Sequence, residues 1–299
     1  MPHLFCFGLG YSAQALIRRL DRRHWRVSGT CRSEEAAAAL RTEGIEVTLF
    51  DRVHPPAAPD AELAGVSHIL SSVPPDETGD PVLADYGPAL ARRPDLAWLG
   101  YLSTTGVYGD RAGGWVDEAS ALTPTGPRGR RRLAAEQGWL ALWQQAGVPV
   151  HIFRLAGIYG PGRSALDTVR AGRAQRIVKP GQVFSRIHVA DIAATLAASI
   201  ARPHPGAAYN LCDDNPAPPD EVIAHAATLL GAPLPPAIPF DQAELSDMAR
   251  SFYADNKRVA NTRIKHELGV ILAYPDYRSG LAALLKGEQE NIAAETRPT

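Results

Sequence analysis

"LFCFGLGYSAQAL", residues 4–16, decides how the N-terminal half of this chain folds. An apolar run is followed by two glycines one residue apart, and a helix-like pattern begins directly after them. Gly8, Gly10 and Ala13 form the pattern G-x-G-x-x-A at a predicted strand–turn–helix junction. There the first glycine permits a tight turn, the second admits a diphosphate, and the alanine lets helix and strand pack closely. The stretch predicts a dinucleotide-binding turn; the alternative is a compact turn without a ligand.

The residues of this turn are the first part of the predicted cofactor site. The first amides of a helix have no partner within the helix, and they carry a partial positive charge that suits phosphate. We therefore expect the cofactor phosphates to lie against Gly8, Leu9, Gly10, Tyr11 and Ser12.

The end of the second predicted strand, residues 25–32, discriminates between the two nicotinamide cofactors. NAD-preferring sites place Asp or Glu there, which hydrogen-bonds the ribose 2′-hydroxyl. This chain has Arg32 instead, flanked by Thr30 and Ser33. A guanidinium attracts the 2′-phosphate of NADP, whereas a carboxylate repels it. The sequence favours NADP, with NAD possible; the alternative is that Arg32 is an exposed residue at the start of a helix.

Two further strand ends complete the predicted cofactor site. Asp51 closes the third strand, where its carboxylate either accepts from the adenine amino group or is simply solvated. Ser72 and Val73 end the fourth strand in "LSSVPP", residues 70–75. Their small size suits a backbone that passes close to the cofactor.

Length and composition restrict the class of protein. The chain has 299 residues, 45% hydrophobic and 21% charged, with a formal net charge of -1. These values are typical of a soluble globular protein and provide no basic field for nucleic acid or an anionic membrane. The three cysteines are far apart, so we expect neither a disulfide scaffold nor a metal site. With no signal peptide and no apolar run of about 20 residues, a cytoplasmic location is expected.

The order of strands and helices predicts an α/β fold of the Rossmann type. Apolar strands alternate with amphipathic helices up to about residue 160, which favours a doubly wound, mostly parallel sheet. Prolines then become frequent and short helices replace the alternation. We expect residues 1–175 to form the dinucleotide-binding domain, with 184–201 packing back on it, and residues 176–299 to form a smaller α+β substrate lobe. The short helices are expected at 190–201, 219–231, 241–251, 257–268 and 276–286.

Five later segments resemble the short-chain dehydrogenase/reductase superfamily, and most closely its extended, nucleotide-sugar-epimerase-like branch. They are "YLSTTGVYGD" (101–110), "FRLAGIYGPGR" (153–163), "FSRIHVADIA" (184–193), "AYNLCDD" (208–214) and "RVANTRIKHELGVILAYPDYRSGL" (258–281). The similarity covers nearly the whole chain. It implies a Rossmann fold, a nicotinamide cofactor and a catalytic set of Ser or Thr, Tyr and Lys.

The catalytic set that this resemblance implies is incomplete here. Thr104 matches the hydroxyl position, but aligning "LAAE", residues 133–136, places Arg128 at the tyrosine position and Arg132 at the lysine position. Arginine stays protonated near neutral pH and cannot act as the general acid or base in the tyrosine's role. The chain therefore resembles the atypical members. The basic run "RGRRR" (128–132) predicts either an anionic partner or a solvated surface turn.

Four other side chains are candidates for the site: Tyr108, Tyr159, His188 and Arg163. Tyr108 and Tyr159 are interpreted as packing residues with bonded hydroxyls. His188 has the side chain suited to acid–base work near neutral pH, although a structural role is favoured. Arg163, after "GPG", is either a ligand for a substrate phosphate or a solvent-facing residue.

Two functions of different classes follow from these observations. The first is an NADP-dependent oxidoreductase or epimerase-like enzyme, with a small anionic or sugar-like substrate between its lobes and Thr104 polarising the reacting oxygen. The second is a non-catalytic dinucleotide binder that senses the cofactor state, because the Tyr/Lys pair is missing. A homodimer is expected by analogy with the extended branch; nucleic-acid and membrane partners are not expected.

Overall fold

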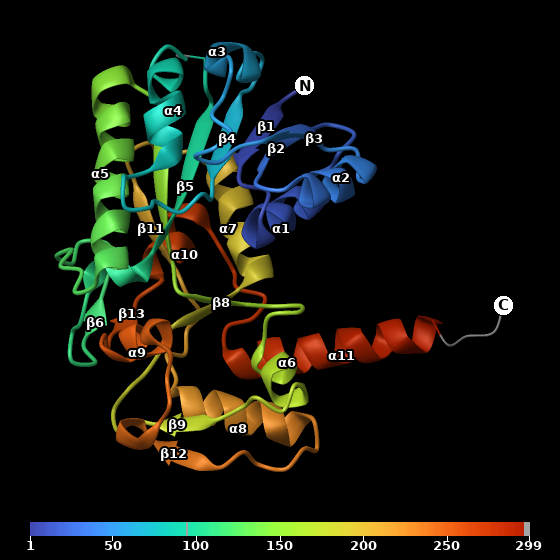
Figure 1. Ribbon diagram of the computed structural model, residues 1–299, viewed down its shortest axis with the longest axis vertical. Coiled ribbons are helices and arrows are strands. Elements are labelled where there is room, and N and C mark those ends of the chain that lie inside the picture. The colour runs from blue at the N-terminus through green and yellow to red at the C-terminus, as the bar shows by residue number, and fades with distance from the viewer. Residues whose placement is uncertain (94, 296–299) are drawn as a thin grey trace.

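The computed structural model describes residues 1–93 and 95–295, and a parallel sheet of seven strands forms its centre (Figure 1). The strand order is β11-β7-β5-β4-β1-β2-β3, and every neighbouring pair is parallel. The strands are β1 (His3–Phe7), β2 (Arg26–Cys31), β3 (Glu46–Leu49), β4 (His68–Ser71), β5 (Trp98–Thr104), β7 (Val150–Leu155) and β11 (Ala208–Leu211). The predicted Rossmann-type fold is confirmed.

Helices cover both faces of this sheet (Figure 1). One face carries α1 (Tyr11–Arg19), α2 (Glu34–Thr42), α7 (Val189–Ala201) and α10 (Thr262–Leu268), and the other carries α3 (Pro59–Glu62), α4 (Pro81–Leu90) and α5 (Pro127–Ala146). The strands are apolar on both sides because both faces are covered. In β1, Leu4 and Cys6 enter one core, whereas Phe5 and Phe7 enter the other. None of the helices in the described ranges has the length and apolar character needed to cross a membrane.

A smaller lobe lies beyond the carboxyl ends of the strands, in the lower half of Figure 1. Its apolar core contains Tyr159, Leu166, Val222, Tyr277 and Leu281. It is built from β8 (Gly157–Tyr159), α6 (Ala165–Arg170), β9 (Arg176–Val178), β10 (Arg186–His188), α8 (Pro219–Leu229), β12 (Ala237–Pro239), η2 (Phe240–Gln242), α9 (Asp247–Tyr253) and α11 (Tyr277–Glu295). Three short elements join the lobes: η1 (Thr105–Tyr108), β6 (Trp115–Val116) and β13 (Arg258–Val259).

The division of the sequence after residue 175 does not separate the two lobes. Helix α7 packs against α1. However, β11 and α10, which the sequence analysis assigns to the smaller lobe, belong to the central sheet and its core. Tyr209 and Leu211 of β11 are fully buried, and α10 contributes Ile264 and Leu268 to the same core. The increase in proline content therefore marks the end of the regular alternation of strands and helices. After it, β11 and α10 return to the first lobe.

Two of the expected short helices begin later than predicted. The helix expected at 257–268 begins at Thr262, because Arg258–Val259 pairs with Trp115–Val116 as a strand. The range 241–251 contains the end of a 3₁₀ turn, and its α-helix begins only at Asp247. At Arg258–Val259 the contact with a distant strand outweighs local helix propensity.

Candidate functional site

The glycine turn after β1 is clamped by two neighbouring strands. Gly8 has a φ of +83°, donates its amide to Thr30 Oγ1 (2.9 Å) and accepts from Ser72 Oγ (2.7 Å). A Cβ atom at Gly8 would lie 2.8 Å from Ser72 Oγ and 3.3 Å from Val73 Cγ2. Only glycine suits this position. Thr30, Ser72 and Val73 therefore shape the turn at the edge of the predicted site.

The second glycine opens the helix toward solvent. Gly10 is the N-cap of α1, no side chain caps that end, and the first turn contains no acid. A Cβ atom at Gly10 would meet nothing within 4 Å, so space is free beside the backbone. Ala13 is fully buried between helix and sheet. This end of α1 fits a diphosphate, which would be held by first-turn amides; Leu9 and Ser12 are buried and offer mainly their backbones.

The residues expected near the adenosine ribose lie at the end of β2. Arg32 is exposed and has no hydrogen bond or ion pair with any other described residue. Ser33 caps α2, since its hydroxyl accepts from the amide of Ala36 (3.3 Å). The guanidinium of Arg32 is thus available to a ligand at the mouth of the site.

Asp51 is engaged within its own loop. Its Oδ1 accepts from the amides of Val53 and His54 and lies 2.9 Å from His54 Nδ1. These contacts organise the turn after β3. They leave both interpretations of Asp51 open, since Oδ2 has no partner in the described ranges.

Thr104 ends β5 at the position expected for a catalytic hydroxyl. Its Oγ1 accepts from the amide of Gly106 (3.1 Å) and so caps the η1 turn. The side chain is partly buried, and its hydroxyl proton has no acceptor in the described part of the chain. Thr104 is therefore free to donate to the oxygen of a ligand.

The arginines of the "RGRRR" run turn to different partners. Arg132 donates to the carbonyl of Leu102 (2.6 Å), and its guanidinium lies 5.6 Å from the centre of the Tyr101 ring. Arg128 is exposed, with its guanidinium 5.7 Å from the Phe252 ring. Arg130 and Arg131 contact Thr125 and Glu77, respectively. The four cations do not converge on one point, which favours the solvated turn over a single anion site.

A buried polar network lies beneath Thr104. Arg154 and Glu136 form an ion pair (2.9 Å) whose side chains are 5% and 1% exposed. Ser103 donates to Glu136, and Arg154 Nη1 donates to the Tyr108 hydroxyl (2.9 Å). The Tyr108 hydroxyl in turn donates to the side chain of Asn210 (2.7 Å). Tyr108 therefore has the bonded, structural environment that its interpretation as a packing residue requires.

A cavity of about 470 Å³ lies in the smaller lobe, next to β8 and β10. Arg163 stands at its edge, and its guanidinium lies 5.9 Å from the centre of the Tyr11 ring. The Tyr11 hydroxyl donates to the carbonyl of Pro161 (3.1 Å). Tyr11 thus connects the glycine turn with the cavity. Polar and aromatic residues that line it include Arg163, Asp167, Arg173, Arg186, Tyr253 and Tyr277.

His188 lies behind this cavity and does not line it. Its Nδ1 accepts from the amide of Ala190 (3.2 Å) and so caps α7. The ring packs against Tyr159 and Tyr274, and burial lowers its pKa to about 4. The imidazole is therefore neutral at pH 7. This environment suits the structural role, and nothing in the geometry points His188 at a substrate.

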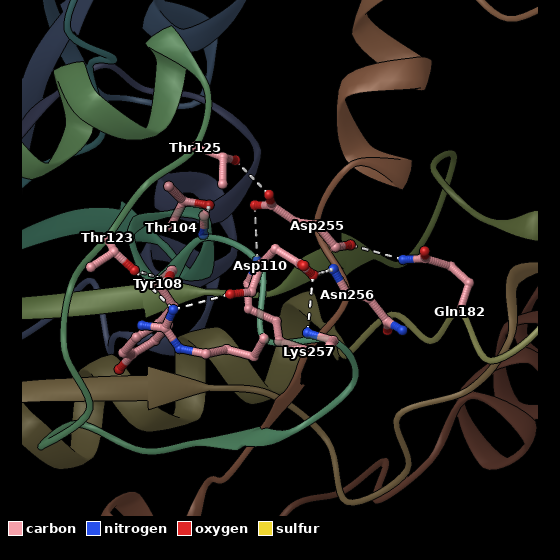
Figure 2. Close-up of polar contacts among 12 residues, drawn as sticks. Thr104, Tyr108, Asp110, Thr123, Thr125, Gln182, Asp255, Asn256 and Lys257 are labelled. Atoms are coloured by element: carbon pink, nitrogen blue, oxygen red, sulfur yellow. Dashed lines mark hydrogen bonds and ion pairs between the residues drawn. The ribbon is translucent and has the colours of Figure 1, made fainter.

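Sequence reasoning missed an ion pair at the entrance to α5. Lys257 Nζ lies 3.1 Å from Asp255 Oδ2, and the two side chains are 10% and 17% exposed. Asp255 Oδ1 accepts from the hydroxyl of Thr125 (2.5 Å), as Figure 2 shows. Burial lowers the pKa of Lys257. The sequence signal for this ion pair was the two opposite charges in "DNK", residues 255–257. It was missed because a helix was expected to begin at residue 257.

The segment around this pair fastens the two lobes together. Gln182 of the smaller lobe donates to the carbonyl of Asp255 (2.8 Å), and the amide of Asn256 donates to Asp110 Oδ1 (2.7 Å) on the other side (Figure 2). The segment 253–257 also reaches the cavity, which Tyr253 lines. It therefore fixes the loop before α5 relative to the cavity wall.

Comparison with known proteins shows a family likeness for the middle of the chain. The model of the NAD dependent epimerase/dehydratase family matches residues 89–212, the range from the end of α4 to the end of β11. This part of the chain is similar to the NAD-dependent epimerase/dehydratase family.

Three known proteins are similar to this chain over nearly their whole length. A functionally unknown conserved protein from Silicibacter pomeroyi is 54% identical, with a TM-score of 0.89 and coverage of 97% of this chain and 100% of its own. Protein YeeZ of Escherichia coli (strain K12) is 29% identical, over 92% of this chain and 97% of its own. dTDP-glucose 4,6-dehydratase from Bacillus anthracis, solved in complex with NAD, is 16% identical with a TM-score of 0.75, over 97% of each chain; it shows the shared fold.

Proposed function

We propose that this chain is an NADP-dependent oxidoreductase or epimerase-type enzyme acting on a small anionic or sugar-like substrate. The glycine turn supports this proposal most directly. It lies between β2 and β4, where the strand order reverses on either side of β1. In open α/β sheets, ligands bind at this switch point, outside the carboxyl ends of the strands.

The cofactor fits the residues around the turn. Amides of Gly10 and Tyr11, at the uncapped start of α1, would hold the diphosphate. Arg32, which is exposed and unpaired among the described residues, would pair with a 2′-phosphate. The Bacillus anthracis dehydratase of similar fold holds NAD, so a nicotinamide dinucleotide is the expected class. When bound, the nicotinamide ring would supply the hydride acceptor or donor.

The substrate is assigned to the cavity beside β8 and β10. Its volume of about 470 Å³ lies in the range of small-molecule sites, roughly 300–1,000 Å³. Arg163 connects it to the turn through Tyr11. Thr104 would donate its hydroxyl proton to the reacting oxygen, while Arg128 and Arg132 hold charge without transferring a proton.

Nucleotide titration tests the cofactor assignment. Fluorescence titration of the purified chain should give tighter binding of NADPH than of NADH, and Arg32→Ala should abolish that difference. Arg23→Ala is the matched control, since Arg23 is an exposed arginine beyond the opposite end of α1, paired with Asp21. Equal affinity of the unmodified chain for both nucleotides would remove the NADP preference, and failure to bind either would reject the proposal.

A second candidate is a non-catalytic sensor of the cofactor state. The hydrogen bond from Arg132 to the carbonyl of Leu102 favours the sensor, because it holds the guanidinium against the protein instead of leaving it free to bind a ribose. Hydride exchange between bound NADPH and a panel of carbonyl and nucleotide-sugar substrates separates the two. Turnover that Thr104→Val reduces at least tenfold supports the enzyme; tight NADPH binding with no exchange supports the sensor.

A further inference from the structure

Arg186 in β10 is a half-buried cation without a hydrogen-bonded carboxylate partner among the described residues. Its Nη1 donates to the carbonyls of Phe184 (2.8 Å) and Ala217 (3.1 Å). Nε and Nη2 have no partner, and the side chain forms no ion pair with any other described residue. Burial lowers the pKa of this guanidinium. An unpaired charge in such a place is unfavourable, and binding an anion would compensate it.

The acids around Arg186 form no ion pair with it, although the charge of Asp213 lies near enough to favour the charged guanidinium. Asp167, the acid that lines the cavity, accepts from both the amide and the hydroxyl of Ser164 at the start of α6 (2.7 Å each). Asp213 uses Oδ1 for the amide of Asn215, and its buried Oδ2 contacts no polar group in the described chain. Burial raises the pKa of Asp213 to about 7.

The acids at the starts of α11 and α8 also form no ion pair with Arg186 among the described residues. Asp276 accepts from the amide of Ser279 (2.7 Å), and its own position before α11 is thereby fixed. Asp220 and Glu221 lie in the first turn of α8, where a carboxylate is favourable beside the helix dipole. The guanidinium of Arg186 therefore keeps its charge and a free edge.

The cavity presents this free cation together with apolar surface. Arg186 lines it with Arg163 and Arg173, against Asp167 as the acid of the lining. Tyr253 and Tyr277 also line it, and further apolar walls come from Val222, Ile223 and Leu281. A ligand that fills this space needs an oxyanion and an apolar or planar body.

We propose that the cavity binds a small organic anion whose carboxylate or phosphate pairs with the Nε/Nη2 edge of Arg186, while its body packs against Tyr253 and Tyr277. This inference rests on the proposed function for treating the cavity as the substrate site, and it names the chemical class of that substrate. The fork of a guanidinium matches either oxyanion with two parallel hydrogen bonds. A neutral sugar would leave the charge of Arg186 uncompensated.

Binding of matched probes to the full chain tests the proposal. The probes are benzoate, phenyl phosphate and benzyl alcohol, which share a ring and differ in charge, together with inorganic phosphate. Calorimetric titration should show at least tenfold tighter binding of one of the two aromatic anions than of benzyl alcohol. Benzoate and phenyl phosphate distinguish a carboxylate from a phosphate ligand, and inorganic phosphate measures the contribution of the oxyanion alone.

Variants then assign the binding to Arg186. Arg186→Gln should weaken the preferred anion at least tenfold, whereas Arg92→Gln, an exposed arginine paired with Asp60 on the α3–α4 side, should leave it unchanged. Arg186→Lys keeps the charge and serves if the glutamine variant does not fold; it should weaken binding less than tenfold but measurably, because a point charge replaces the fork. Equal binding of anions and benzyl alcohol by the unmodified chain, or unchanged anion binding in Arg186→Gln, would overturn the proposal.

A parallel NADPH titration separates this inference from the proposed function. Tight NADPH binding without anion binding overturns the anion site alone. Anion binding without any nicotinamide nucleotide binding overturns the proposed function and leaves the cavity assignment standing.

Discussion

The hydroxyl of Ser72 donates to the carbonyl of Gly8 at 2.7 Å, which fastens the end of β4 to the turn that follows β1. This bond sits on the border between the two halves of the sheet. It fixes the backbone of the first glycine while the second, Gly10, faces open space. The two glycines therefore have separable tasks, one in folding and one in binding.

Alanine substitutions at these glycines should separate the two tasks. Gly8→Ala introduces a Cβ at a positive φ and 2.8 Å from Ser72 Oγ, so we expect a loss of about 1–3 kcal/mol in the free energy of unfolding. Gly10→Ala has an ordinary φ of -87° and no steric contact, so the fold should remain stable while NADPH affinity falls at least tenfold. Denaturant unfolding and nucleotide titration measure the two effects. A Gly10→Ala variant with unchanged NADPH affinity would contradict the placement of the diphosphate.

Glu136→Gln should be among the most destabilising single changes in the first lobe. It leaves the buried guanidinium of Arg154 without its counter-ion, at an expected cost of about 3–5 kcal/mol. Glu77→Gln removes the partner of Arg131 at the surface, where Glu77 is 84% exposed, and should cost less than about 1 kcal/mol. Urea unfolding of both variants gives the comparison, and similar losses in the two would show that burial does not govern these pairs.

The contribution of His188 to the stability of the protein should be lost in mild acid because its imidazole is neutral in the fold. Its pKa is about 4 when folded, whereas the unfolded value is 6.5, so the unfolded chain binds the additional proton between these values. This contribution is complete above pH 6.5 and is lost as the pH falls toward 4, by about 2 kcal/mol at pH 5. His188→Asn retains a capping acceptor for α7 and should flatten the decrease. Unfolding at pH 5 and pH 7.5 tests this, and an unchanged slope in the variant would refute it.

The Lys257–Asp255 pair should contribute more than a comparable surface pair. Lys257→Gln breaks a partly buried, charged hydrogen bond and should cost about 2 kcal/mol. Lys265→Gln breaks the more exposed contact with Asp214 and should cost less than about 1 kcal/mol. Thermal unfolding of the two variants provides the measurement; equal changes would indicate that the segment 253–257 does not depend on its ion pair.

The glycine turn could be predicted from the sequence because its determinants are neighbours along the chain. Gly8, Gly10 and Ala13 occupy one strand–turn–helix junction, and Ser33 caps the next helix by a bond across three residues. The geometry of such local patterns is determined by residues that are close together in the sequence. The same holds for the alternating strands and helices of the first half of the chain.

The cavity and the segment 253–257 could not be predicted in the same way. Arg186 is exceptional only because the surrounding acids are engaged elsewhere, which depends on contacts between distant segments. Likewise, Arg258 is extended because it pairs with Trp115, which lies far away in the sequence. The expected helix at 257–268 is inferred from local sequence, which holds no information about that partner.

Tyr11 stands in the first turn of α1, and its ring lies beside the guanidinium of Arg163 at the cavity edge. One aromatic side chain at the start of α1 therefore contacts a residue that lines the cavity. An occupant that shifts Arg163 would alter the environment of the helix start, and thermodynamic linkage requires the nucleotide to change the occupant's affinity by the same factor. Any coupling between the two molecules would therefore pass through the contact between Tyr11 and Arg163.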